Sequence, residues 1–183
     1  SIKCTLKYLS PDMEENYPGN LDCTVTYELN NNNEFLIEFH AISDQDTIVN
    51  LTNHNYWNFH GHGDKYQNNE DHVVKVNSKS ICESNEQSIT TGKLLEVEGT
   101  KYNLQNNFLI NDIFLKSGGI DHNYVLQDQS MNEAVATIYS KKTGLGVEYF
   151  TNQNGIQFYT GNMMLDKYIG KYKKPYGFQY GMC

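Results

Sequence analysis

Arginine is absent from this chain of 183 residues, and all 14 basic residues are lysines. With 22 acidic residues, the formal net charge is -8 at pH 7. Nucleic-acid binding requires clustered cations that neutralise phosphates, so we expect no nucleic-acid partner. A phosphate site built on a bidentate guanidinium fork is excluded as well, because only arginine carries that group.

Long apolar runs are also lacking. No stretch approaches the ~20 consecutive apolar residues that a membrane-spanning helix requires, so we expect no membrane partner. Residues 1–7 lack the apolar core of a signal peptide. The four cysteines are scattered without metal-binding spacing. So few cysteines favour a reduced, cytoplasmic protein.

Apolar side chains alternate with polar ones along much of the chain, which is the period of a half-buried strand. Residues 21–29 and 35–41 alternate on either side of an asparagine run, and this pattern predicts a β-hairpin. A second hairpin is predicted for residues 134–140 and 145–151. Further strands are predicted for residues 73–76, 91–97 and 155–161, and residues 47–49 form a strand-like run.

Only residues 106–114 predict a helix, of one or two turns. Many short strands separated by turn residues indicate an all-β sandwich or barrel. The sequence shows neither an internal repeat nor a linker. We therefore predict a single β domain over residues 1–183.

Residues 50–58 read Asn-Leu-Thr-Asn-His-Asn-Tyr-Trp-Asn and surround His54 with amides and aromatic rings. Amides donate and accept hydrogen bonds, and aromatic faces suit the C–H faces of a sugar ring. A histidine can exchange a proton near neutral pH. The segment therefore predicts a polyol-binding site with an acid or base, with Asn53 as one binding residue. A structural role for His54 is the alternative.

Three further segments carry side chains suited to binding. Residues 10–21 contain acids and a Pro-Gly turn before a predicted strand, which is also the composition of a shaped surface loop. In residues 118–126 Asp121 could accept a ligand hydroxyl or cap a turn. In residues 155–161 Gln157 could face a sugar or serve as a cross-strand partner.

Taken together and in this order, these segments resemble the aldose 1-epimerase family, also called galactose mutarotases. Residues 10–21 resemble the family's Ser-Pro-Asp-x-Glu-Glu-x-Tyr-Pro-Gly-Asn-Leu segment. Residues 49–58 resemble its Asn-Leu-Thr-Asn-His-x-Tyr-Phe-Asn segment, with Trp57 in place of the usual phenylalanine. Residues 119–125 and 155–162 match its Gly-x-Asp-His-Asn and Gly-x-Gln-Phe-Tyr-Thr-Gly-Asn segments.

The resemblance implies a large antiparallel β-sandwich of the galactose mutarotase-like type. It also implies interconversion of the α and β anomers of galactose, glucose and related aldohexoses, without a metal or dissociable cofactor. In the family, the histidine matching His54 is the general acid toward the ring oxygen. The residues matching Asp121 and Gln157 bind sugar hydroxyls.

The same resemblance implies a base that this sequence does not show. The family's base is the glutamate of a Gly-Phe-x-x-Glu-Thr-Gln segment, whereas Gly177-Phe178 is followed here by Gly181-Met182-Cys183 at the Glu-Thr-Gln positions. An arginine and a second histidine of the family would precede Ser1. We therefore expect an incomplete sandwich, as a fragment or a degenerate relative. We expect it to be weak or inactive alone and to expose sheet edges that permit self-association.

Two other functions stay open. A non-catalytic sugar-binding relative would keep the binding residues without turnover. A hexose-6-phosphate 1-epimerase-like protein would need a phosphate grip, against which the absence of arginine argues. A metal site built from histidines is expected to be absent, because no cysteine or carboxylate pattern completes it. The histidines considered for it are His54, His60, His62 and His72.

Overall fold

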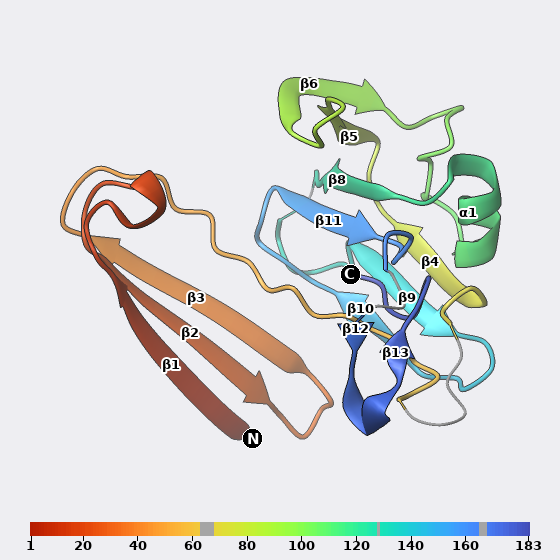
Figure 1. The fold of residues 1–183 in the computed structure, drawn as a ribbon, viewed down its shortest axis with the longest axis horizontal. Coiled ribbons are helices and arrows are strands. Elements are labelled where there is room, and N and C mark those ends of the chain that lie inside the picture. Colours follow the sequence, from red (N-terminus) through yellow and green to blue (C-terminus); the bar gives the residue numbers. More distant parts are fainter. Residues whose placement is uncertain (63–67, 128, 165–167) are drawn as a thin grey trace. The chain divides into compact units, whose positions relative to one another are not determined.

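The computed structural model of the chain describes residues 1–62, 68–127, 129–164 and 168–183. These residues form two compact units, Ser1–His54 and Asn55–Cys183, each of which is described by itself (Figure 1). The prediction of one domain over residues 1–183 stays a prediction.

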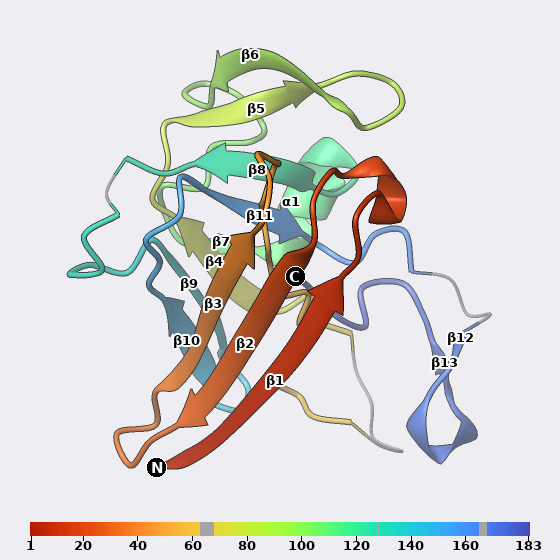
Figure 2. The same cartoon turned by 90° about the vertical axis from the view of Figure 1, so that its left-hand side faces the viewer.

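The unit Ser1–His54 is built on a three-stranded antiparallel sheet in the order β1-β2-β3 (Figure 2). Its strands are β1 (Ile2–Ser10), β2 (Leu21–Leu29) and β3 (Phe35–Ser43). The predicted β2–β3 hairpin is confirmed, and its turn is closed by Asn30. The Asn30 side-chain oxygen accepts hydrogen bonds from the backbone N–H groups of Asn32 and Glu34, at 2.9 and 3.1 Å.

Residues 10–21 form the loop between β1 and β2, with a short 3₁₀ turn at Glu14–Asn16. The Glu14 carboxylate accepts hydrogen bonds from the hydroxyls of Tyr8 and Ser10, both at 2.6 Å. The hydrogen bond from Ser10, followed by the one from Tyr8, lowers the pKa of Glu14. The Asp12 side chain accepts a hydrogen bond from the backbone N–H of Gly19 at 2.6 Å. The loop is thus shaped by its own acids.

The unit Asn55–Cys183 contains two four-stranded antiparallel sheets, in the orders β10-β9-β4-β7 and β11-β8-β5-β6. The first sheet is made of β4 (His72–Val76), β7 (Phe108–Leu109), β9 (Ala136–Ser140) and β10 (Gly146–Tyr149). The second is made of β5 (Ser80–Ser84), β6 (Thr90–Glu96), β8 (Asp121–Val125) and β11 (Gly155–Tyr159). A two-stranded ribbon of β12 (Tyr168–Ile169) and β13 (Pro175–Tyr176) completes the described strands.

One apolar core serves both four-stranded sheets. Val74 of β4 and Ile138 of β9 belong to the same buried cluster as Tyr124 of β8 and Phe158 of β11. The helix α1 (Ile110–Ser117) adds Ile110 and Ile113 to it, which explains the apolar spacing of that segment. Among the described residues, no helix is long and apolar enough to cross a membrane. The predicted antiparallel, all-β architecture is confirmed.

Two predictions of local structure are corrected. The strand-like run 47–49 forms no strand. Ile48 and Val49 are 76% and 45% exposed, so their β-branched side chains lack the packing on which β propensity depends. The helix begins and ends later than predicted, because Phe108–Leu109 pairs with β4 and Gly118 ends the helix in the left-handed conformation.

The segment 179–183 lies between two other parts of its unit and is bonded to both. Met182 exchanges backbone hydrogen bonds with Trp57, at 2.8 and 3.0 Å. Cys183 does the same with Tyr159, at 2.7 and 2.9 Å. The approach is so close that a Cβ atom on Gly161, at φ +77°, would lie 2.1 Å from the Gly181 carbonyl oxygen.

We expect Gly161→Ala to lower the free energy of unfolding more than Gly118→Ala, measured by urea denaturation. Both glycines have a similar positive φ, +77° and +73°, but a Cβ atom on Gly118 meets nothing within 4 Å. Left-handed strain costs both variants roughly 1–2 kcal/mol. Overpacking adds about 1–3 kcal/mol at Gly161 alone. Equal effects of the two variants would contradict the close crossing.

Candidate functional site

Asp121 and Gln157 lie on neighbouring antiparallel strands of the second unit. In the register of β8 and β11, Asp121 is opposite Tyr159, and Gln157 is opposite Asn123. The two side chains are therefore diagonal neighbours on one face of the sheet. The Gln157 amide donates a hydrogen bond to Asp121 Oδ1 at 2.8 Å, and both residues are exposed. The structure thus brings together two of the predicted site residues.

Asn123 belongs to the same polar face, and sequence reasoning did not single it out. Its side-chain oxygen accepts a hydrogen bond from the Cys82 thiol at 3.6 Å. A Cβ atom on Gly155 would lie 2.5 Å from that oxygen, so the glycine makes room for the amide. The signal that could have found Asn123 is the two-residue period of a strand, which places it on the face of Asp121.

Aromatic rings flank this polar face. Tyr159 is the register partner of Asp121, and its ring meets that of Tyr56 edge to face, with centroids 6.5 Å apart. The Tyr159 hydroxyl accepts a hydrogen bond from the backbone N–H of Met163 at 2.8 Å. The Tyr159 ring is buried, whereas the Tyr56 ring is exposed. Amides, a carboxylate and an exposed tyrosine ring are groups that bind the hydroxyls and C–H faces of a sugar.

Cys183 contributes a thiol beside these tyrosines. Burial raises its pKa to about 11, a hydrogen bond with Tyr56 lowers it, and the charge of Asp121 raises it further. Partial desolvation, followed by the proximity of Cys183, raises the pKa of Tyr56. The pKa of Tyr159 is raised as well, chiefly by burial. At neutral pH all three groups are protonated and uncharged.

His54 and Asn53 belong to the unit Ser1–His54, so the structure describes them separately from Asp121 and Gln157. His54 is exposed. Asn53 is half-buried, and its side-chain amide donates a hydrogen bond of 3.4 Å to the hydroxyl of Tyr27 on β2. The acid role of His54 and the sugar-binding roles of the other three residues stay predictions.

The placement of residues 181–183 at the family's Glu-Thr-Gln positions stays a prediction, and none of these three side chains is a base at neutral pH. Gly181 has no side chain, and Met182 is completely buried. The Cys183 thiol keeps its proton at neutral pH because its pKa is about 11. A side chain on Gly181 would point toward Tyr56, since its Cβ atom would lie 3.1 Å from the Tyr56 ring. Position 181 therefore borders the face that carries Tyr56 and Tyr159.

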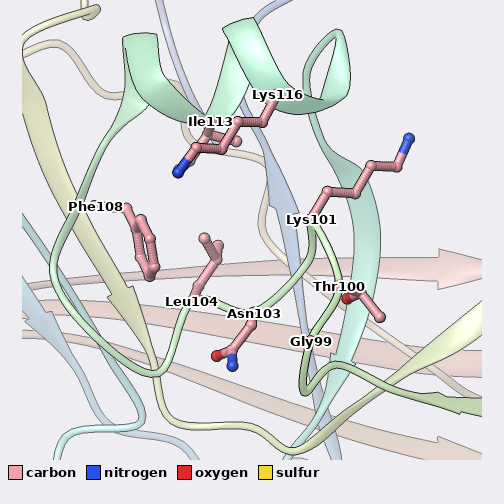
Figure 3. Close-up of a pocket in the computed structure, with 8 residues that line it drawn as sticks. All are labelled: Gly99, Thr100, Lys101, Asn103, Leu104, Phe108, Ile113 and Lys116. Atoms are coloured by element: carbon pink, nitrogen blue, oxygen red, sulfur yellow. The ribbon is translucent and has the colours of Figure 1, made fainter.

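A separate cavity of about 260 Å³ lies between α1 and the loop that follows β6 (Figure 3). Leu104, Phe108 and Ile113 give it apolar walls, and Lys101 and Lys116 add two cations. Small-molecule sites measure about 300–1,000 Å³, so this cavity falls below their usual size. None of the predicted site residues lines it. It does not compete with the Asp121 face as the candidate site.

Of the histidines considered as metal ligands, the structure places His60 and His72 beside Asp71. Their ligand atoms all lie within 4.8 Å of one another. His62 is directed elsewhere, with its Nε2 atom 2.7 Å from the Tyr176 hydroxyl.

Comparison with known proteins identifies relatives over nearly the whole chain. Residues 2–180 match the family described as aldose 1-epimerase. The galactose mutarotase of Sus scrofa is 35% identical over 177 residues, which is 96% of this chain and 51% of that protein. The chain thus spans about half the length of such relatives.

Two solved structures show the same fold. A galactose 1-epimerase from Lactobacillus acidophilus NCFM is 25% identical and has a TM-score of 0.83, over 98% of this chain and 52% of that one. An aldose epimerase homologue from C. elegans has a TM-score of 0.86 at 21% identity, over 98% of this chain and 54% of that one. The predicted fold is confirmed by this likeness.

We expect Cys183 to react with iodoacetamide more slowly than the exposed Cys4 at mildly alkaline pH. The thiolate is the nucleophile, and a pKa of about 11 leaves Cys183 almost entirely protonated there. Its rate should rise with pH until about 11. Peptide mass spectrometry of the folded chain follows both sites, and unfolding in urea serves as the control. Equal rates in the folded chain would contradict the burial of Cys183.

Proposed function

This chain belongs to the aldose 1-epimerase family, and from that premise we propose that it serves the interconversion of the α and β anomers of free aldohexoses such as galactose and glucose. The observation that carries the proposal is the Gln157–Asp121 hydrogen bond of 2.8 Å on an exposed sheet face. A preformed amide–carboxylate pair beside Tyr159 offers both donors and acceptors to adjacent sugar hydroxyls.

Anomer interconversion needs an acid and a base. The acid gives a proton to the ring oxygen while the base takes one from the anomeric hydroxyl, and the ring opens to an aldehyde. After rotation about the bond to the aldehyde carbon, the ring closes on the other face with the proton flow reversed. We assign the acid to His54, because an imidazole can both donate and recover a proton near neutral pH.

We propose in addition that the chain is weak or inactive by itself, because it lacks the base. By its resemblance to the family segment, Gly181 takes the place of the family's glutamate, and the nearby thiol of Cys183 retains its proton at neutral pH. General acid–base catalysis by a positioned group contributes ~10²–10⁴-fold, so the loss of the base removes an effect of that order.

Gly181→Glu should give the chain a mutarotation rate above the spontaneous one, and His54→Ala in the same background should abolish that gain. A side chain fits at position 181 if the Tyr56 ring moves by a few tenths of an ångström. The expected gain is ~10²-fold or more, because the new carboxylate can accept the anomeric proton. A coupled assay that starts from pure α-galactose or α-glucose measures it.

Gly181→Gln is the matched control, since it has the same length without a base and should gain nothing. A His54-dependent rate already present in the unaltered chain would overturn the claim of inactivity. Equal rates for the Glu and Gln variants would overturn the role assigned to position 181.

A non-catalytic sugar-binding protein is the second candidate function. The Asp121–Gln157 pair is intact while position 181 has no side chain, so binding can persist without turnover. A hexose 6-phosphate is the less favoured ligand, because the chain contains no arginine to grip the phosphate.

Calorimetric titration with galactose or glucose should show saturable binding that weakens in Asp121→Ala and in Gln157→Ala. A hydrogen bond to a charged group contributes about 1.5–3 kcal/mol, which corresponds to roughly tenfold weaker binding or more. Gln153→Ala, an exposed amide outside the pair, should leave binding unchanged. Absence of binding at millimolar sugar would remove both functions, and a preference for 6-phosphorylated sugars would favour the phosphate epimerase.

A further inference from the structure

His60, Asp71 and His72 form a polar cluster at the edge of the core. The oxygen Asp71 Oδ1 lies 2.9 Å from His60 Nε2 and 3.1 Å from His72 Nδ1. The His72 side chain is completely buried, and that of His60 is only 5% exposed. The two rings meet edge to face, with centroids 4.6 Å apart. One carboxylate oxygen thus faces two buried imidazoles.

The hydrogen bonds of His72 determine its tautomer. Its Nε2 atom accepts a hydrogen bond from the backbone N–H of Phe59 at 3.0 Å and therefore carries no proton. Its Nδ1 atom carries the ring proton and donates it to Asp71 Oδ1. Burial first, and then the charge of His60, lower the pKa of His72. His72 is therefore neutral, and its contacts are satisfied.

The contacts of His60 require one more positive charge. Its Nδ1 atom lies 3.0 Å from the carbonyl oxygen of Asn68, which can only accept, so Nδ1 carries a proton. In a neutral ring the Nε2 lone pair would then face Asp71 Oδ1 at 2.9 Å, with the imidazole buried and the carboxylate 40% exposed. The contact between His60 Nε2 and Asp71 Oδ1 is short, but its geometry is not that of a hydrogen bond. Among the described residues, Nε2 has no hydrogen-bond partner. A proton or a metal ion must compensate for this repulsion.

Among the described residues, this cluster does not fit a metal ion. To bind it, His72 Nδ1 would have to lose its proton while Nε2 already accepts the Phe59 N–H, and both ring nitrogens would then be deprotonated. Without His72, the three-residue group retains only His60 and Asp71 as ligands. Structural zinc sites use about four ligands and catalytic ones about three from the protein.

We propose that His60 is protonated on both ring nitrogens and forms an ion pair with the partly exposed carboxylate of Asp71, to which the neutral His72 donates a hydrogen bond. His60 is then a positioning residue. Through its contacts with Asn68 and Asp71, His60 holds residues 57–60 close to the start of β4. The exposed Glu70 is the further acid nearby, and its carboxylate accepts a hydrogen bond from the Asn68 amide at 3.1 Å.

Residues 57–60 are also hydrogen-bonded to segment 179–183, which borders the candidate site. The Asn58 side-chain amide donates to the Tyr180 carbonyl oxygen at 3.1 Å and accepts from the His60 N–H at 2.9 Å. Trp57 pairs with Met182. The ion pair of His60 therefore helps to position residues 57–60, which directly follow Tyr56. His60 itself is not expected to contact a substrate.

The test is the protonation state of each histidine in the full ¹⁵N-labelled chain at neutral pH, read from long-range ¹H–¹⁵N spectra. We expect both His60 nitrogens to have imidazolium shifts, and His72 to have the shifts of a neutral ring protonated at Nδ1. Asp71→Asn should return His60 to a neutral ring. Glu70→Gln, which removes the adjacent charge, should leave His60 protonated on both nitrogens.

Through-bond correlation of the ring with its own Cβ assigns His60 in the unaltered chain, so the result does not depend on how well a variant folds. A neutral His60 in the unaltered chain would overturn the proposal. So would a His60 that stays doubly protonated in a folded Asp71→Asn variant. Stoichiometric zinc binding that displaces the ring protons of both histidines would replace the ion pair with a metal site.

Discussion

The double pairing of segment 179–183 is the constraint on which the rest of the second unit depends. Hydrogen bonds to Trp57 on one side and to Tyr159 on the other hold this segment in place, although it forms no strand of a named sheet. They bring Tyr56, Tyr159 and Cys183 to one place, and these residues are far apart in the sequence. Backbone bonds of this kind do not depend on side-chain identity. The segment can therefore differ from its relatives in composition and still keep its path.

Glycine at positions 161 and 181 makes that path possible. Gly161 admits the carbonyl oxygen of Gly181, and Gly181 leaves space beside the Tyr56 ring. The amide and carboxylate groups on β8 and β11 are held by the sheet register and do not need a side chain at position 181. A sheet can thus keep a ligand-binding face after a reacting group at its border has been replaced. Family membership is shown here, whereas the part of position 181 in turnover belongs to the proposed function.

Strong local patterns in the sequence predicted much of the fold. The β2–β3 hairpin followed from alternation around an asparagine turn, and the family motifs led to the confirmed antiparallel β architecture. The strand-like run Thr47–Val49 forms no strand, because β propensity is not sufficient without a neighbouring strand to pair with. Asp121 and Gln157 were named as separate candidates, but their mutual hydrogen bond depends on a register that no single-sequence pattern encodes. The His60–Asp71 contact was missed for a similar reason, since loop geometry brings those residues together.

The hydrogen bond between Gln157 and Asp121 makes the two residues one thermodynamic unit. A ligand hydroxyl that reaches Asp121 Oδ1 competes with the amide already bonded there, so occupancy of the face exchanges one partner for another. Residues in contact have interaction energies of about 0.5–3 kcal/mol, and their individual losses do not add. The effect of replacing both residues will therefore differ from the sum of the two single replacements. A double-mutant cycle across this pair reports how much of the ligand's affinity belongs to the pair itself.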